Sequence, residues 1–143
     1  MADTLNQKQV RILIADDSST LRRNLKKLLE SHSNRWKVCA EAADGMEAVQ
    51  QAIESKPDMI ILDFQMPFMD GLTASARISK SMPKVPILIY TIHKTEFVDL
   101  EAKKAGVREV ILKSDSRELV RAVKGLLAKD HERAAPKEKE ASA

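Results

Sequence analysis

Five short apolar runs, separated by segments of helical period, constrain the fold of this chain more than any other feature. Each run has the length of a strand and is rich in branched residues. Three of them are continuously apolar, which is typical of strands covered on both faces of a sheet. The runs lie at 10–15, 37–42, 59–63, 86–91 and 109–113. Their alternation with helices predicts right-handed crossovers and an α/β fold with a doubly wound, five-stranded parallel sheet.

The segments between the runs carry apolar residues at the spacing of amphipathic helices. In the first segment four leucines, beginning with Leu21, fall on one side, while Arg22 and three further cations point elsewhere and are interpreted as a solvated face. Gly106 is suited to the left-handed position after a helix, and Asp115 to a helix N-terminus. Helices are predicted at 19–31, 45–55, 72–82, 96–106 and 115–129.

The pattern predicts one domain over 10–129, preceded by a flexible segment at 1–9. Residues 130–143 contain Pro136, alternating charges and no large apolar side chain, and are predicted to form a disordered charged tail. The single cysteine, Cys39, excludes an intrachain disulfide and is expected to be a buried, inert thiol.

Charge and hydropathy bear on two classes of partner. The net charge of +3 is modest for 143 residues and does not argue for nucleic acid. Residues 130–143 are too few to supply the two packed helices of a helix-turn-helix, so we expect no nucleic-acid binding by the chain itself. No apolar run approaches the length of a membrane span, and no secretion signal is recognisable, so we expect no membrane association and a cytoplasmic location.

Polar residues follow four of the five predicted strands at the points where the strands end. Asp16 and Asp17 follow the first strand, Asp63 ends the third, Thr91 the fourth and Lys113 the fifth. Open α/β sheets bind ligands beyond the carboxyl ends of their strands. We therefore expect three acids, a hydroxyl and an amine to meet at one edge.

This set of side chains suits metal-assisted phosphoryl chemistry. Crowded carboxylates repel one another unless a cation lies among them, and hard oxygen ligands favour Mg²⁺. Asp63 is then the candidate nucleophile, because an aspartate can accept a phosphoryl group as an acyl phosphate. Lys113 and Thr91 would neutralise the new oxygens and donate hydrogen bonds to them.

Each residue also has a structural interpretation. An aspartate at a strand end commonly forms a turn or caps a helix, so Asp16 and Asp17 could cap the helix that follows them. Lys113 could be a solvated strand end, and Thr91 alone is uninformative. The joint occurrence of all five at the ends of four strands favours the functional interpretation.

Four stretches together resemble the receiver domains of two-component response regulators, within the CheY-like superfamily. They are "ILIADDSSTLRR", "IILDFQMPFMDG", "ILIYT" and "VILKS", in that order and spacing, and the match covers about residues 10–129. The resemblance implies a flavodoxin-like (βα)5 fold with strand order 2-1-3-4-5. Ser114, where most receivers have proline, makes "LKS" more similar to the receivers of NarL-type regulators.

The resemblance also implies the roles of the site residues. Asp17 and Asp63 would bind Mg²⁺ directly together with the backbone carbonyl of Gln65, and Asp16 would hold it through water. Asp63 would take a phosphoryl group from a phosphohistidine on a sensor histidine kinase. Thr91 and Lys113 would read the phosphorylated state and rearrange the face formed by the fourth helix, fifth strand and fifth helix, toward an unknown downstream protein or an attached output domain.

Two further departures from the family concern the conformational change that phosphorylation would cause at this face. Val110 stands where family members often have a tyrosine or phenylalanine, and Ile92 follows Thr91 where alanine or glycine is usual. A small branched side chain cannot turn inward as a ring does, and Ile92 is expected to crowd the path of Thr91. The usual switch mechanism is thereby put in question, whereas the phosphoacceptor chemistry is unaffected.

Two other functions compete with a phosphoacceptor signalling domain that catalyses its own phosphorylation and dephosphorylation. A phosphatase of the haloacid dehalogenase type also uses a strand-end aspartate and Mg²⁺, but it needs a second acid two residues later to protonate the leaving group. That position is Gln65 here, which cannot do so. A receiver that has lost its chemistry and acts as an interaction module is the other alternative, and the complete set of five residues weighs against it.

Overall fold

The computed structural model describes the backbone of residues 8–142 and the side chains of residues 8–129. Strands and helices alternate along this range, as the sequence predicts. The elements are β1 (Val10–Ala15), α2 (Ser19–His32), β2 (Trp36–Ala42), α3 (Gly45–Ser55), β3 (Met59–Leu62), α4 (Gly71–Ser81), β4 (Ile87–Thr91), α5 (Glu96–Lys104), β5 (Glu109–Leu112) and α6 (Ser116–Ser142).

The five strands form one parallel sheet in the order β2-β1-β3-β4-β5, which confirms the predicted fold and strand order. Ala15 at the end of β1 pairs with Leu62 at the end of β3, and Thr91 at the end of β4 pairs with Leu112 at the end of β5. The residues that follow these pairs therefore leave the sheet at the same edge.

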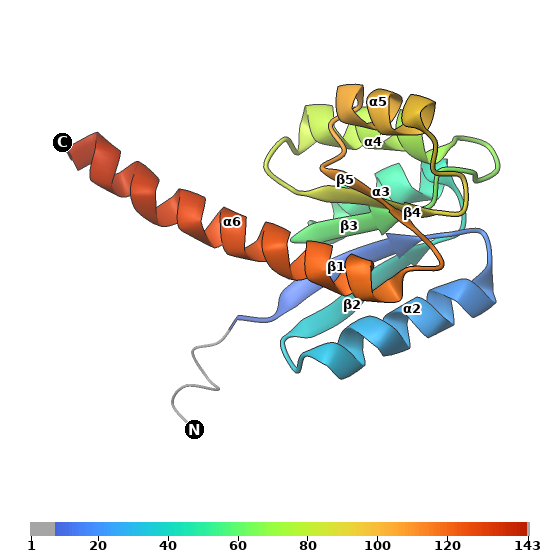
Figure 1. Ribbon diagram of the computed structural model, residues 1–143, viewed down its shortest axis with the longest axis horizontal. Helices are drawn as coiled ribbons and strands as arrows, with labels where there is room; N and C mark the ends of the chain where they lie inside the picture. The colour runs from blue at the N-terminus through green and yellow to red at the C-terminus, as the bar shows by residue number, and fades with distance from the viewer. Residues whose placement is uncertain (1–7, 143) are drawn as a thin grey trace.

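Helices cover both faces of the sheet, as expected for continuously apolar strands. Figure 1 shows α2 and α6 on one side of the sheet and α4 and α5 on the other. Side chains alternate between the two layers, so Ile12 and Ile14 pack with α2 and α6, while Leu13 and Ala15 pack with α3, α4 and α5. The central strands are buried on both faces and give the residues at their ends a rigid support.

Each helix begins at a side chain that accepts a hydrogen bond from a backbone N–H of its first turn. Short polar side chains at this position satisfy donors that the helix itself leaves unpaired. The capping residues are Ser18, Asp44, Asp70, Thr95 and Asp115. Asp115 was the predicted start of the last helix, and Gly106 has the left-handed φ of 91° expected after α5.

Two side chains are less buried than the sequence predicts. Leu21, in the first turn of α2, is 41% exposed. Cys39 is half-buried because it lies on the edge strand β2. The backbone of α6 is helical to Ser142 and projects away from the domain (Figure 1). The disordered tail that Pro136 and the alternating charges predict stays a prediction.

The proposed domain limits of 10–129 remain a prediction. Residues 1–7 of the expected flexible N-terminus lie outside the described part of the chain. None of the helices within the described range combines the length and the hydropathy that spanning a bilayer requires.

Phe68 adopts a strained backbone conformation in the loop between β3 and α4. Its φ is 68°, and 85% of its side chain is exposed, so little buried apolar area offsets the strain. A left-handed conformation costs a residue with a bulky side chain roughly 1–2 kcal/mol, whereas asparagine adopts it more readily.

We predict that Phe68→Asn raises the free energy of unfolding by about 1 kcal/mol, because asparagine relieves this strain without loss of buried contacts. Urea denaturation measures the change. Phe97→Asn is the matched control, since Phe97 is also exposed but lies in α5 with helical backbone, and it should give no gain. Equal effects of the two substitutions would contradict a backbone origin.

Candidate functional site

Asp16 and Asp63 lie next to each other because their strands end in register. Ala15 and Leu62 pair across β1 and β3, and the Asp63 N–H donates to the Ala15 carbonyl at 3.0 Å. The exposed fractions of Asp16 and Asp63 are 6% and 7%. Two carboxylates are thus held together in a poorly solvated site, an arrangement that needs a compensating cation.

Lys113 supplies positive charge to both carboxylates. Its Nζ donates to Asp16 Oδ2 at 2.6 Å and to Asp63 Oδ2 at 3.0 Å. Burial by itself would lower the pKa of Lys113, but the hydrogen bonds and charges of the two aspartates outweigh it, so the pKa of Lys113 is raised. The ammonium therefore stays charged and joins the ends of β1, β3 and β5.

The three acids expected at this edge do meet. Carboxylate oxygens of Asp16, Asp17 and Asp63 lie within 4.8 Å of one another. Asp63 Oδ1 is buried and, among the described residues, has no hydrogen-bond partner. Asp17 is exposed, so the cluster opens to solvent on one side. Hard oxygen donors, one of them buried and unsatisfied, fit a hard divalent cation such as Mg²⁺.

Thr91 is fully buried at the end of β4 and borders Lys113. Its carbonyl accepts from the Lys113 N–H at 3.0 Å, and its hydroxyl oxygen accepts from the His93 N–H at 3.2 Å. Tyr90 lies on the other face of β4, and its hydroxyl donates to the Lys113 carbonyl at 3.0 Å. Burial raises the pKa of Tyr90, Lys113 lowers it and Asp115 raises it again, with a net upward direction. The backbone of Lys113 is thus held at both its N–H and its carbonyl.

The other predicted residues lie around this centre. Gln65 is exposed in the loop after Asp63. Ile92 is 67% exposed directly after the end of β4, and the expected crowding of the path of Thr91 stays a prediction. Val110 is half-buried in β5.

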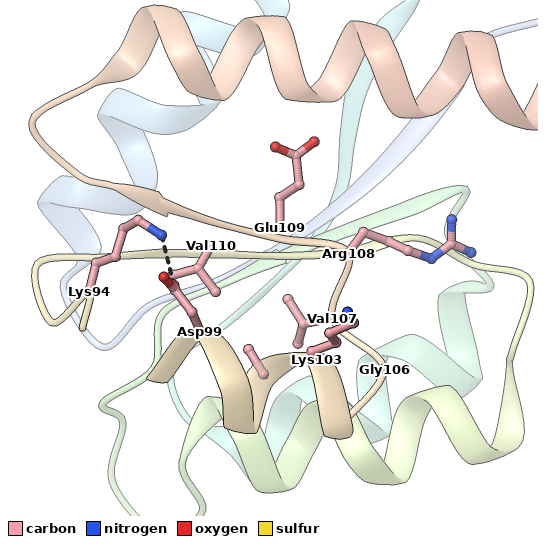
Figure 2. Close-up of a pocket in the computed structure, with 9 residues that line it drawn as sticks. Lys94, Asp99, Lys103, Gly106, Val107, Arg108, Glu109 and Val110 are labelled. Carbon is pink, nitrogen blue, oxygen red and sulfur yellow. Dashed lines mark hydrogen bonds and ion pairs between the residues drawn. The ribbon is translucent and has the colours of Figure 1, made fainter. Parts of the chain in front are cut away.

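Val110 lines a cavity of about 680 Å³ between α5 and β5. Figure 2 shows the ion pair between Lys94 and Asp99 beside this cavity, with Nζ and Oδ1 2.7 Å apart, and the side chain of Glu109 pointing away from it on the other side of β5. This surface is polar and has no aromatic side chain among the residues that line the cavity.

The backbone after Asp63 leaves no room for a side chain at Gly71. A Cβ at this position would overlap the Asp63 backbone oxygen and lie 2.9 Å from its carbonyl carbon. The Gly71 N–H donates to the Phe64 carbonyl at 2.6 Å. The start of α4 therefore packs directly on the backbone of Asp63.

Sequence reasoning missed two residues of the first helix that shape the site. Arg22, which was interpreted as part of a solvated face, donates from Nη1 to the Asp16 carbonyl at 2.6 Å and from Nε to Glu41 Oε1 at 3.0 Å. Ser18 caps α2 and also donates its N–H to Asp16 Oδ1 at 2.9 Å. The available signal was position, because side chains one turn into a helix point back toward its N-terminus.

Comparison with known proteins assigns the chain to a family. The sequence profile of the family described as "Response regulator receiver domain" matches residues 12–124. A protein-glutamate methylesterase/protein-glutamine glutaminase of Caldanaerobacter subterraneus subsp. tengcongensis is 38% identical over 130 residues, which are 82% of this chain and 35% of that protein. The oxygen regulatory protein NreC of Staphylococcus epidermidis is 38% identical over 117 residues, 80% of this chain and 53% of that protein. The chain thus spans about half or less of the length of these relatives.

Solved structures give the same result. The response regulator domain of Thermotoga maritima CheB has a TM-score of 0.77 and 28% identity, covering 85% of this chain and 98% of that one. A LuxR-family two-component response regulator from Aurantimonas has a TM-score of 0.81 and 33% identity, covering 85% and 87%. With the profile match over most of its length, the chain belongs to the response regulator receiver domain family of two-component systems.

Proposed function

We propose that this receiver domain accepts a phosphoryl group on Asp63 from a phosphohistidine of a sensor histidine kinase, in a Mg²⁺-dependent reaction. The observation that carries the proposal is the state of the Asp63 carboxylate. It is buried, one oxygen is bonded to Lys113, and the other has no partner among the described residues. A carboxylate in this state is poised to form a new bond.

Asp17, Asp63 and the backbone carbonyl of Gln65 are the proposed direct ligands of Mg²⁺, and Asp16 is proposed to act through water. The clustered oxygens support this assignment. Asp16 already uses both carboxylate oxygens, toward Ser18 and Lys113, which suits an indirect role. When bound, Mg²⁺ neutralises the charge that gathers between the incoming phosphoryl group and the carboxylates.

In the proposed transfer, an Asp63 oxygen attacks phosphorus, the bond between phosphorus and the donor imidazole nitrogen breaks, and the imidazole leaves with the electron pair. The Lys113 ammonium stays protonated and is placed to neutralise the new phosphoryl oxygens. The Thr91 hydroxyl is proposed to donate a hydrogen bond to one of them after releasing its contact with His93. The same site would later catalyse its own dephosphorylation.

The competing functions are weaker. Phosphatase chemistry of the haloacid dehalogenase type needs an acid at position 65, where glutamine stands. An inactive interaction module would have no need of a buried acid with an unsatisfied oxygen. This chain spans 35% and 53% of the length of the two relatives named above, and it is proposed to relay its signal to a downstream protein or to an attached output domain.

The proposed responding surface comprises α5, β5 and the start of α6. Val110 lacks a ring that could change sides, so the response must come from the loop after Thr91 and from α5. The outward position of Ile92 leaves that loop few apolar contacts to restrain it.

We predict that Asp63 is the sole phosphoacceptor, since its carboxylate alone adjoins both Lys113 and the acidic cluster with an oxygen to spare. Incubation with acetyl phosphate and Mg²⁺ should add one phosphoryl group, detected by intact-protein mass spectrometry. Asp63→Asn should add none, while Asp99→Asn, an exposed acid on α5, should behave as the wild type. A label retained in Asp63→Asn would refute the assignment.

We predict that Asp17→Ala abolishes phosphorylation at millimolar Mg²⁺, because it removes a direct ligand, and that Asp16→Ala reduces it by a smaller factor. Calorimetric titration with Mg²⁺ tests the ligand assignment independently of the reaction. If Asp16→Ala lost Mg²⁺ binding and Asp17→Ala kept it, the direct and water-mediated roles would be reversed.

We predict that a phosphoryl mimic alters the α5 surface. Amide hydrogen exchange with and without beryllofluoride and Mg²⁺ should show changed protection from Ile92 through Ala105, because the loop and helix move together. Asp63→Asn is the control and should show no change. Effects restricted to the loops at Asp17 and Asp63 would rule out a switch on this surface.

A further inference from the structure

Every polar atom of Asp16 has a hydrogen-bond partner, in contrast to Asp63. Its N–H donates to the Ala42 carbonyl at 3.0 Å, Oδ1 accepts from the Ser18 N–H, and Oδ2 accepts from Lys113. The backbone carbonyl accepts from Arg22 Nη1 at 2.6 Å. Asp16 is therefore the most constrained residue of the acidic cluster. Among its hydrogen-bond partners, Arg22 is the helix side chain that the sequence analysis did not place at the site.

Arg22 reaches this carbonyl from the second turn of α2 and is itself held in place. Its Nε donates to Glu41 Oε1 on β2 at 3.0 Å, while Nη1 faces Asp16. The Arg22 side chain is 18% exposed and that of Glu41 is 40% exposed, so the guanidinium is largely shielded from solvent while its partner carboxylate stays partly screened. A planar guanidinium can serve two acceptors in fixed directions, which a lysine ammonium cannot do as well.

We propose that Arg22 is a positioning residue for the Mg²⁺ site. In this proposal Glu41 holds the positive charge of Arg22 away from the carboxylates of the acidic cluster. The inference rests on the proposed function. Arg22 fixes the peptide unit that joins Asp16 to Asp17, and so sets where the Asp17 carboxylate lies relative to Asp63. Residues that orient metal ligands commonly change metal affinity by about 10- to 100-fold when they are replaced.

The two residues should act through one side chain and should therefore be coupled. Without Arg22, the carbonyl of Asp16 loses its partner and the loop from Asp16 to Ser18 loosens. Without the Glu41 charge, the guanidinium is released beside an acidic cluster, where it competes with a divalent cation. Once Arg22 is absent, Glu41 has no cation to direct, so its replacement should have no further effect.

Calorimetric titration with Mg²⁺ tests the proposal on five variants of the full chain. Arg22→Met removes the donors but keeps an apolar stem, and Arg22→Lys keeps the positive charge on a single donor nitrogen. Glu41→Gln removes the partner charge, and the double variant combines Arg22→Met with Glu41→Gln. Arg23→Met is the matched control, because Arg23 is the exposed neighbour on the same helix. The amide exchange rate of Ser18 reports the order of the loop without any metal.

We expect the Mg²⁺ dissociation constant to rise roughly tenfold in Arg22→Met and by a smaller factor in Arg22→Lys and Glu41→Gln. The double variant should match Arg22→Met, Arg23→Met should match the wild type, and Ser18 exchange should accelerate in Arg22→Met. Should Arg22→Met fail to fold, Arg22→Lys and Glu41→Gln carry the test, since both retain the stem of Arg22.

Three results would overturn the inference. They are wild-type Mg²⁺ affinity in Arg22→Met, additive effects of the two substitutions, and an equal loss in Arg23→Met, which would show a general effect of helix charge. A wild-type protein that binds no Mg²⁺ would instead refute the proposed function, and unchanged Ser18 exchange in Arg22→Met would then refute the positioning role separately.

Discussion

The shared ammonium of Lys113 is the interaction on which the arrangement of this molecule depends. Two aspartates with exposed fractions of 6% and 7% adjoin across β1 and β3, and their mutual repulsion would oppose folding if no cation were present. Lys113 contributes that charge from β5, two strands away from β3 in the sheet. The ion pairs of Lys113 join the end of β5 to the ends of β1 and β3. The strand order therefore brings the charges together, and the charge balance in turn stabilises that strand order.

The backbone on the other side of Asp63 is constrained as tightly as its side chain. The start of α4 packs on the Asp63 carbonyl so closely that position 71 admits only glycine, and the loop reaches that position through the left-handed Phe68. The acid is therefore fixed from two directions, while one of its oxygens stays unpaired among the described residues.

The sequence was informative wherever one period or one strand end determined the outcome. The strands and the meeting of Asp16, Asp17, Asp63 and Lys113 followed from apolar runs and from the rule that parallel strands end at one edge. The strand order came from the resemblance to receiver domains. The role of Arg22 did not follow, because an arginine on a helix has the same sequence pattern whether it is solvated or reaches a backbone carbonyl. The exposure of Ile92 and the φ of Phe68 depend on the geometry of loops, whose sequences show no hydrophobic periodicity from which it could be predicted.

The position of these constraints also indicates where signalling specificity must lie. The acids and Lys113 are tied to the ends of buried strands, so substitutions there would disturb core and chemistry together. The surface formed by α5 and β5 does not hold the acids or Lys113, so substitutions there need not disturb the acidic cluster. In this chain Val110 and several charged residues line the cavity on that surface. Similar domains belong to a methylesterase/glutaminase and to an oxygen regulatory protein, whose outputs differ. If this chain has the proposed phosphoacceptor function, one rigid site can serve different outputs only through a surface that is free to vary.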